Sequence, residues 1–131
     1  MLVAEARVAR LATAGERGPH VVPITFAVLE ERIVTAIDHK PKTTRSLKRL
    51  ANIARDPGVS MLVDHYSDDW ESLWWCRLDG RATVHGDGPA FGDAIDALAA
   101  KYPQYGTHPP EGPVIVIDVE RRTGWTAVER H

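Results

Sequence analysis

The sequence is poor in cysteine, since Cys76 is the only one among 131 residues. An internal disulfide and a CxxC metal or redox motif are therefore excluded. No apolar run approaches the roughly 20 residues that are needed to span a bilayer. A charged segment followed by an apolar one, which would mark a signal peptide, is also missing at the start. We expect a protein of the reducing cytoplasm that does not bind membranes.

An excess of positive charge is missing too. The chain has 16 Lys and Arg residues against 18 Asp and Glu residues, for a formal net charge of -2. A general nucleic-acid binder would carry a surplus of Lys and Arg, so no nucleic-acid partner is expected. The length fits a single domain, residues 1–131, and it is enough to bury a hydrophobic core without disulfides or metals.

Six segments rich in β-branched and aromatic residues alternate with turn signals, a pattern typical of β-strands. The segments are residues 7–13, 20–28, 32–38, 58–65, 74–86 and 113–127. Pro23 interrupts the second segment and predicts an edge or a bulge, because proline cannot donate a ladder hydrogen bond. The Asp79-Gly80 pair predicts a bulge in the fifth. The run from Val114 to Ile117 does not alternate, which predicts that both faces are covered there.

Two segments have helical periodicity, residues 43–54 and 90–102. The first places Leu47, Leu50, Ala51 and Ala54 on one face, and the second carries a longer apolar stripe that ends before Pro103. Six strands and two helices in one small domain predict a mainly β, α+β fold that closes, or nearly closes, into a barrel. Periodicity alone does not separate a barrel from a sandwich.

The segment from His39 to Arg55 holds six Lys or Arg residues and no acid. It begins where a strand ends and a helix starts, and a helix N-terminus already favours an anion. Lys40, Lys42 and Thr43 add donors there, so they are candidates for a phosphate site. The alternative is a solvated basic helix face, which we expect Lys48 and Arg49 to form. The sequence contains neither a glycine-rich Walker loop nor a GxGxxG motif, so we do not expect a P-loop or Rossmann nucleotide site.

No set of side chains for acid-base or nucleophilic catalysis can be recognised. The six histidines lack metal-ligand spacing, so we predict no metal site and name no catalytic residue. An enzyme with this sequence would therefore rely on a cofactor for its chemistry. The adjacent Trp74 and Trp75 lie on one predicted strand and face opposite sides of it. One of them could face a ligand or a second subunit, or both could serve only core and dimer packing.

Several short motifs, in a fixed order, resemble a known superfamily. They are ARLAT at 9–13, GxxGPHVVPITF at 15–26, HKPKTTR at 39–45 and DPGVSMLVD at 56–64. Together they resemble the split β-barrel superfamily of pyridoxamine-phosphate-oxidase-like flavin binders. Within it, the chain is most similar to the F(420)-dependent class of flavin/deazaflavin oxidoreductases. Three longer segments resemble one subgroup of F(420)-binding enzymes: DHKPKTTRSLKRLANI, VDHYSDDWESLWW and KYPQYG.

The resemblance implies a six-stranded split barrel with flanking helices and a homodimer with two equivalent sites at the subunit interface. It places the cofactor phosphate at Lys40, Lys42 and Thr43, the residues that the basic segment had indicated. The residues that it implies beside the ring system are Val21, Val22, Pro23, Ile24, Thr35, Ala36 and Ile37. Trp75 and Arg77 are the residues that we expect to contribute across the dimer.

The function that the resemblance implies is hydride transfer between reduced coenzyme F(420) and a small conjugated organic acceptor. Two alternatives stay open: an FMN-dependent oxidoreductase of the same fold, and a cofactor-binding or storage protein without turnover. One feature departs from the family, whose members often carry a helix before the first strand. Only residues 1–6 precede the first strand here.

Overall fold

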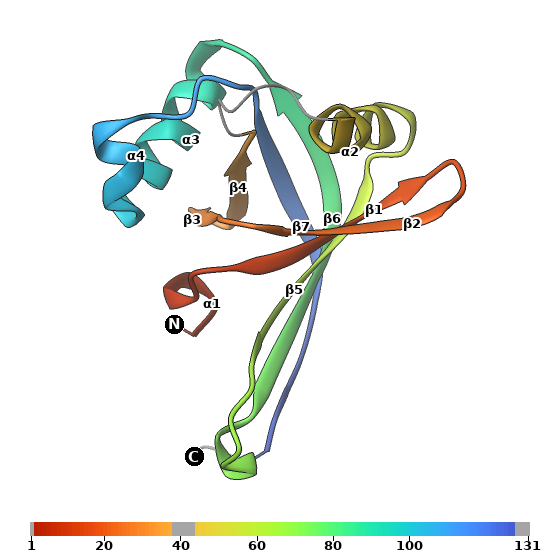
Figure 1. The fold of residues 1–131 in the computed structure, drawn as a ribbon, viewed down its shortest axis with the longest axis vertical. Coiled ribbons are helices and arrows are strands. Elements are labelled where there is room, and N and C mark those ends of the chain that lie inside the picture. The colour runs from red at the N-terminus through yellow and green to blue at the C-terminus, as the bar shows by residue number, and fades with distance from the viewer. Residues whose placement is uncertain (1, 38–43, 128–131) are drawn as a thin grey trace.

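The computed structural model describes residues 2–37 and 44–127, without the side chains of 44–47. Seven antiparallel strands form one curved sheet in the order β2-β1-β5-β6-β7-β4-β3 (Figure 1). The strands are β1 Ala9–Gly15, β2 Gly18–Ile24, β3 Ala27–Leu29, β4 Arg32–Ala36, β5 Gly58–His65, β6 Trp74–His85 and β7 Val114–Thr126. The mainly β, α+β prediction is confirmed.

Short helices flank the sheet. They are α1 Leu2–Glu5, α2 Thr44–Arg55, α3 Gly88–Lys101 and α4 Pro103–Thr107, with one 3-10 turn, η1 Trp70–Ser72. Figure 1 shows α3 and α4 beside β3 and β4, while α2 lies near β1 and β6. Both expected helices are present, and α1 occupies the segment before the first strand. Within the described parts of the chain, no helix is long and apolar enough to cross a membrane.

The sheet has one strand more than expected, because the second predicted strand breaks into β2 and β3 at Thr25 and Phe26. Here the backbone bonds to side chains instead of to a neighbouring strand. The Thr35 hydroxyl donates to the carbonyl of Thr25 at 2.6 Å. The N–H of Phe26 donates to the Tyr102 hydroxyl at 3.2 Å, and Lys101 Nζ donates to the Phe26 carbonyl at 2.9 Å. These bonds hold the chain out of the ladder for two residues.

The break lets the sheet curl into a split barrel. β2 and β3 are the two edges of the sheet, yet Ile24 and Ala27, where one ends and the other starts, are separated by only Thr25 and Phe26. The ends of the sheet must therefore approach each other around a common interior. The largest fully buried side chains of that interior are Leu11, Phe26, Met61, Leu78, Ile115 and Ile117.

A second hydrophobic cluster lies outside the barrel, under α3. Its buried members on the helical side are Ala94, Leu98 and Tyr102. They pack with Val114 and Val116 of β7. The intervening Ile115 and Ile117 belong to the barrel interior. The prediction that both faces of this strand are covered is therefore confirmed.

Two predictions about strand irregularity also hold. The register between β6 and β7 shifts at Asp79 and Gly80, which is the predicted bulge. A Cβ atom on Gly80 would collide with the backbone carbonyl of Asp118, so glycine is required at this close approach. Pro23 lies on β2, which is an edge strand as its missing N–H requires.

The face by which α2 packs is only partly the expected one. Leu50 packs against the barrel core as predicted. Ala51 and Ala54 are exposed, whereas Asn52 and Ile53 are buried. The Asn52 side-chain amide donates to the Thr13 hydroxyl at 3.1 Å, which holds this polar residue against β1. Apolar spacing alone mispredicted the orientation because a buried side-chain hydrogen bond turns the helix toward its amide.

The Tyr102 hydroxyl generates a prediction about stability. It accepts the N–H of Phe26, and its proton is shared between the carbonyls of Arg7 and Phe26, both at 2.9 Å. Tyr102→Phe leaves a buried N–H without its acceptor, so we expect the free energy of unfolding to fall by about 1–3 kcal/mol. Urea unfolding measures the loss. The exposed Tyr66, changed to Phe, is the matched control and should stay within about 0.5 kcal/mol of the parent.

Lys101 generates a prediction about pH. Burial, with Arg7 nearby, lowers the pKa of Lys101 to about 8. The pKa of a lysine in the unfolded chain is about 10.4. Between these values the unfolded state binds more protons, so this group makes the free energy of unfolding rise as the pH rises. In Lys101→Met this rise should disappear. Urea unfolding at several pH values from 7 to 10 tests it, with the exposed Lys48→Met as control; identical profiles for Lys101→Met and the parent would contradict the assignment.

Candidate functional site

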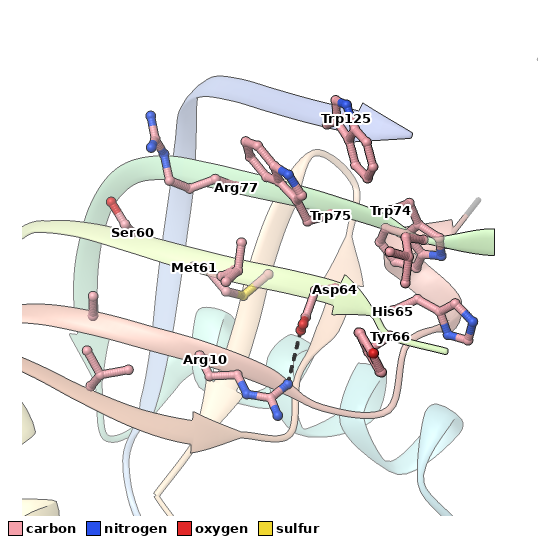
Figure 2. Close-up of a pocket in the computed structure, with 14 residues that line it drawn as sticks. Arg10, Ser60, Met61, Asp64, His65, Tyr66, Trp74, Trp75, Arg77 and Trp125 are labelled. Atoms are coloured by element: carbon pink, nitrogen blue, oxygen red, sulfur yellow. Dashed lines mark hydrogen bonds and ion pairs between the residues drawn. The ribbon is translucent and has the colours of Figure 1, made fainter. Parts of the chain in front are cut away.

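The outer face of the sheet carries a groove of about 720 Å³ over β1, β5 and β6, with β2 and β7 at its sides (Figure 2). Side chains alternate along each strand, so the outward ones meet their neighbours in rows across the sheet. Three such rows underlie the groove: Asp64, Trp75 and Trp125; Arg10, Leu62 and Arg77; and Ala12, Ser60 and Asp79, of which Asp79 lies beyond the lining. Residues far apart in sequence thus form one continuous surface.

Indole rings form one wall of the groove. Trp75 on β6 stands directly opposite Trp125 on β7, and Figure 2 shows the two rings side by side above β5. The neighbouring Trp74 alternates toward the interior, where it packs against the barrel core, and its edge reaches the end of the groove. Of the two adjacent tryptophans, Trp74 therefore packs mainly against the core, and Trp75 lines the groove.

Charges lie among these apolar residues. Near the C-terminal end of β5, Arg10 pairs with Asp64 at 3.3 Å, and both side chains are about half exposed (Figure 2).

At the opposite end of the groove, the carboxylate of Asp79 accepts the Ser60 hydroxyl at 2.6 Å and faces the Nε atoms of Arg77 at 3.2 Å and Arg121 at 3.4 Å. The Ser60 hydrogen bond, with the two guanidinium groups, lowers the pKa of Asp79. One carboxylate thus faces two guanidinium groups.

Four of the residues predicted for the cofactor site lie on this outer face. Val21, Trp75 and Arg77 line the groove itself. Pro23 is exposed on β2, where it stands opposite Arg10 and faces the same side as Val21. The structure therefore brings together residues from the second and fifth predicted strands that the sequence had placed only by resemblance.

The other described residues of that set lie elsewhere. Val22 and Ile24 point into the barrel, and Ile37 belongs to the same interior cluster. Thr35 is fully buried and binds the Thr25 carbonyl, while Ala36 packs against the cluster under α3. None of these five residues lines the groove.

Lys40, Lys42 and Thr43, the predicted phosphate ligands, lie outside the described residues. The phosphate site stays a prediction.

Arg49 on α2 is a candidate that sequence reasoning placed on a solvated face. Its side chain is half-buried, and its Nε atom is buried without a hydrogen-bond partner in the described structure. Burial lowers the pKa of Arg49. The signal that could have found it is spacing, because Arg49 lies one turn before the buried Ile53 and so on the packed side of the helix.

The described side chains offer little for direct catalysis. Residues 2–37 and 44–127 contain no group of three or more His, Cys, Asp or Glu that could hold a metal. Cys76 is buried, and burial raises the pKa of its thiol, so a reactive thiolate is disfavoured. The groove is lined largely by apolar side chains and two indole rings, so it is suited to binding a flat, largely apolar group.

Comparison with known proteins identifies the family. Residues 1–126 match the pyridoxamine 5'-phosphate oxidase family. The chain belongs to the pyridoxamine 5'-phosphate oxidase family. Membership confirms the resemblance at this level, while the F(420)-dependent class stays a prediction. No curated protein matches the chain.

Solved structures share the fold of this pyridoxamine 5'-phosphate oxidase family member. A conserved hypothetical protein from Mycobacterium tuberculosis has 22% identity and a TM-score of 0.77, covering 95% of this chain and 80% of its own. A FAD-binding protein from Mesorhizobium loti has 22% identity and a TM-score of 0.72, over 93% and 87%. A heme binding protein from Mycobacterium smegmatis has 20% identity and a TM-score of 0.71, over 95% and 55%.

The buried Nε of Arg49 generates a prediction. An N–H that is buried without an acceptor is costly, so Arg49→Met should raise the free energy of unfolding by about 1 kcal/mol. Inorganic phosphate should raise the Tm of the parent and not that of Arg49→Met, since a ligand of the folded state stabilises it. Thermal and urea unfolding measure both effects.

The exposed Arg17, changed to Met, is the control for the Arg49 variant and should leave stability within about 0.5 kcal/mol. A clear loss of stability in Arg49→Met would mean that the guanidinium already has a stabilising partner.

Proposed function

We propose that this protein binds coenzyme F(420), with its ring in the groove, and transfers a hydride between the reduced coenzyme and a small conjugated organic acceptor. The observation that carries the proposal is the groove itself. Its volume of about 720 Å³ lies within the range of roughly 300–1,000 Å³ that small-molecule sites occupy. The indoles of Trp75 and Trp125 offer flat apolar surface suited to a tricyclic ring.

Support for a flavin-type coenzyme comes from the family and from its named neighbours. Proteins from Mesorhizobium loti and Mycobacterium smegmatis that share the fold are described as FAD-binding. The choice of F(420) over FMN depends on the resemblance of residues 38–53, 63–75 and 101–106 to one subgroup. FMN is the alternative coenzyme, and storage without turnover is the alternative role.

Each part of the site has a role in this proposal. When bound, the deazaflavin supplies the hydride chemistry. Val21 and Leu62 form apolar floor beside the indoles, which excludes water from the reacting faces. Arg10 and Arg77 supply cationic donors at the polar edge of the ring. Lys40, Lys42 and Thr43 are the residues proposed to bind the phosphate.

The same face supports a homodimer with two equivalent sites. Val21 is 59% exposed, Trp125 48% and Leu62 37%, although all three are large and apolar. A contiguous apolar surface of this kind is typical of a protein interface or a ligand site. In our proposal a second copy covers the groove, so that each coenzyme is bound between two subunits.

A titration tests the coenzyme and its phosphate site together. Fluorescence is followed as the purified protein is titrated with oxidised F(420) and, separately, with FMN. We expect saturable binding with a preference for F(420), and Lys42→Ala should weaken it by about 1–3 kcal/mol, the effect of losing a charge-assisted bond. Arg17→Ala, an exposed cation in the β1–β2 turn, is the control and should bind as the parent does.

Each of the other outcomes would support a different function. Preference for FMN would make it an FMN-dependent oxidoreductase, and binding of neither coenzyme would refute the proposal. Binding of reduced F(420) without its oxidation by a panel of quinones, tetrapyrroles and other conjugated acceptors would favour storage. Haemin is titrated as well, because His65 lines the groove and one structural neighbour is named for heme.

A further inference from the structure

A second pocket, of about 280 Å³, lies between the start of α3 and strands β3, β4, β6 and β7. Strands β6 and β7 contribute to it and to the groove, but no residue of the described chain lines both. The volume is just below the range of roughly 300–1,000 Å³ that is usual for drug-sized ligands. The pocket therefore suits a molecule of only a few heavy atoms.

The floor of this pocket is apolar. Val34 on β4 and Val116 on β7 stand opposite each other, and both are buried. Leu29 of β3 and Ala90 of α3 add apolar surface beside them. Covering these side chains removes apolar area from water, so a short hydrocarbon chain would bind favourably against the floor.

Two carboxylates stand on different walls of the pocket. Glu30 lies in the turn between β3 and β4, and Asp93 lies on α3. Neither carboxylate has a hydrogen bond or an ion pair with another residue in the described parts of the chain. A third acid, Asp118, is already paired with Arg32 Nε at 2.9 Å. Within residues 2–37 and 44–127, the pocket thus has two negative charges without partners.

The surrounding sequence strengthens this negative charge. Residues 82–100, which run from β6 through most of α3, contain three Asp residues and no Lys or Arg. Glu31 adjoins Glu30 in the turn. Charges of one sign around a cleft raise the local concentration of ligands of the opposite sign. The ligand that matches this pocket is therefore a cation.

The arrangement fits an organic cation better than a metal ion. A hard divalent cation needs several oxygen ligands around one point. The described residues contain no group of three or more His, Cys, Asp or Glu that could hold a metal. Ammonium groups at the two ends of a hydrocarbon chain, by contrast, can each meet one carboxylate while the chain covers the apolar floor.

The backbone at Glu30 is consistent with a role for its side chain. Glu30 has a φ of 59°, and it is the only residue other than glycine with a positive φ in the described chain. This left-handed conformation favours Gly or Asn over Glu. A glutamate at such a position is strained, and strain of this kind is often retained where a side chain has a function.

We propose that this pocket binds a short aliphatic diamine in its doubly protonated form. One ammonium group pairs with Glu30 and the other with Asp93, while the methylene chain lies over Val34 and Val116. The site is separate from the coenzyme groove, so this proposal does not depend on the proposed function.

Titration calorimetry of the full chain with 1,4-diaminobutane, at low ionic strength, tests the site. We expect saturable binding of one molecule per chain, at least about tenfold tighter than that of 1-aminobutane, which meets only one carboxylate. Glu30→Gln and Asp93→Asn should each weaken the binding of the diamine at least about tenfold. Asp96→Asn is the control, because it removes the same charge from an exposed position of α3 outside the pocket, and its Kd should stay within about twofold of the parent value.

Glu30→Gly separates binding from folding. Glycine accepts a positive φ without strain, so the Tm of this variant should equal or exceed that of the parent, while its affinity for the diamine falls at least about tenfold. Parental affinity in Glu30→Gly or in Asp93→Asn would overturn the proposal. So would the absence of saturable binding, equal affinity for 1-aminobutane, or displacement of the diamine by an equal concentration of MgCl₂. None of these results bears on F(420) binding, since neither carboxylate lines the groove.

Discussion

The N–H of Phe26 donates to the hydroxyl of Tyr102, and Lys101 donates to the carbonyl of Phe26, so neither backbone group bonds to a neighbouring strand. This contact ends β2 and turns the chain into β3, so the two edges of one sheet come from neighbouring residues. The barrel can close only because the backbone groups at the turn have partners on α3 and beside it, since unpaired buried groups would be costly.

The groove owes its character to the alternation of side chains. Along β6, Cys76 and Leu78 fill the barrel while Trp75, Arg77 and Asp79 face outward. The same strand therefore stabilises the fold with one set of residues and presents aromatic rings and charges with the other. A single-residue slip of register would exchange the two sets, so the core and the candidate site specify each other.

Local signals in the sequence predicted much of the fold. The fourth predicted strand has the observed bounds of β5, and the bulge at Asp79 and the two-sided burial of β7 were visible in residue type and spacing. The break at Phe26 was not, because its partner Tyr102 is 76 residues away. Arg49 was misplaced for a similar reason, since its burial depends on how Asn52 docks against β1. The meeting of Val21 and Trp75 in one groove depends on the order of the strands, which residue patterns do not contain.

Proline on the outermost strand has a consequence for how the folded protein behaves in concentrated solution. Pro19 and Pro23 lie four residues apart on β2, so both have the same orientation in the strand, and each fits where its nitrogen faces away from β1. The free edge of β2 thus lacks N–H donors at two of its outward positions, with only Val21 between them. A strand added at this border would form fewer ladder hydrogen bonds, which disfavours edge-to-edge growth into fibrils there.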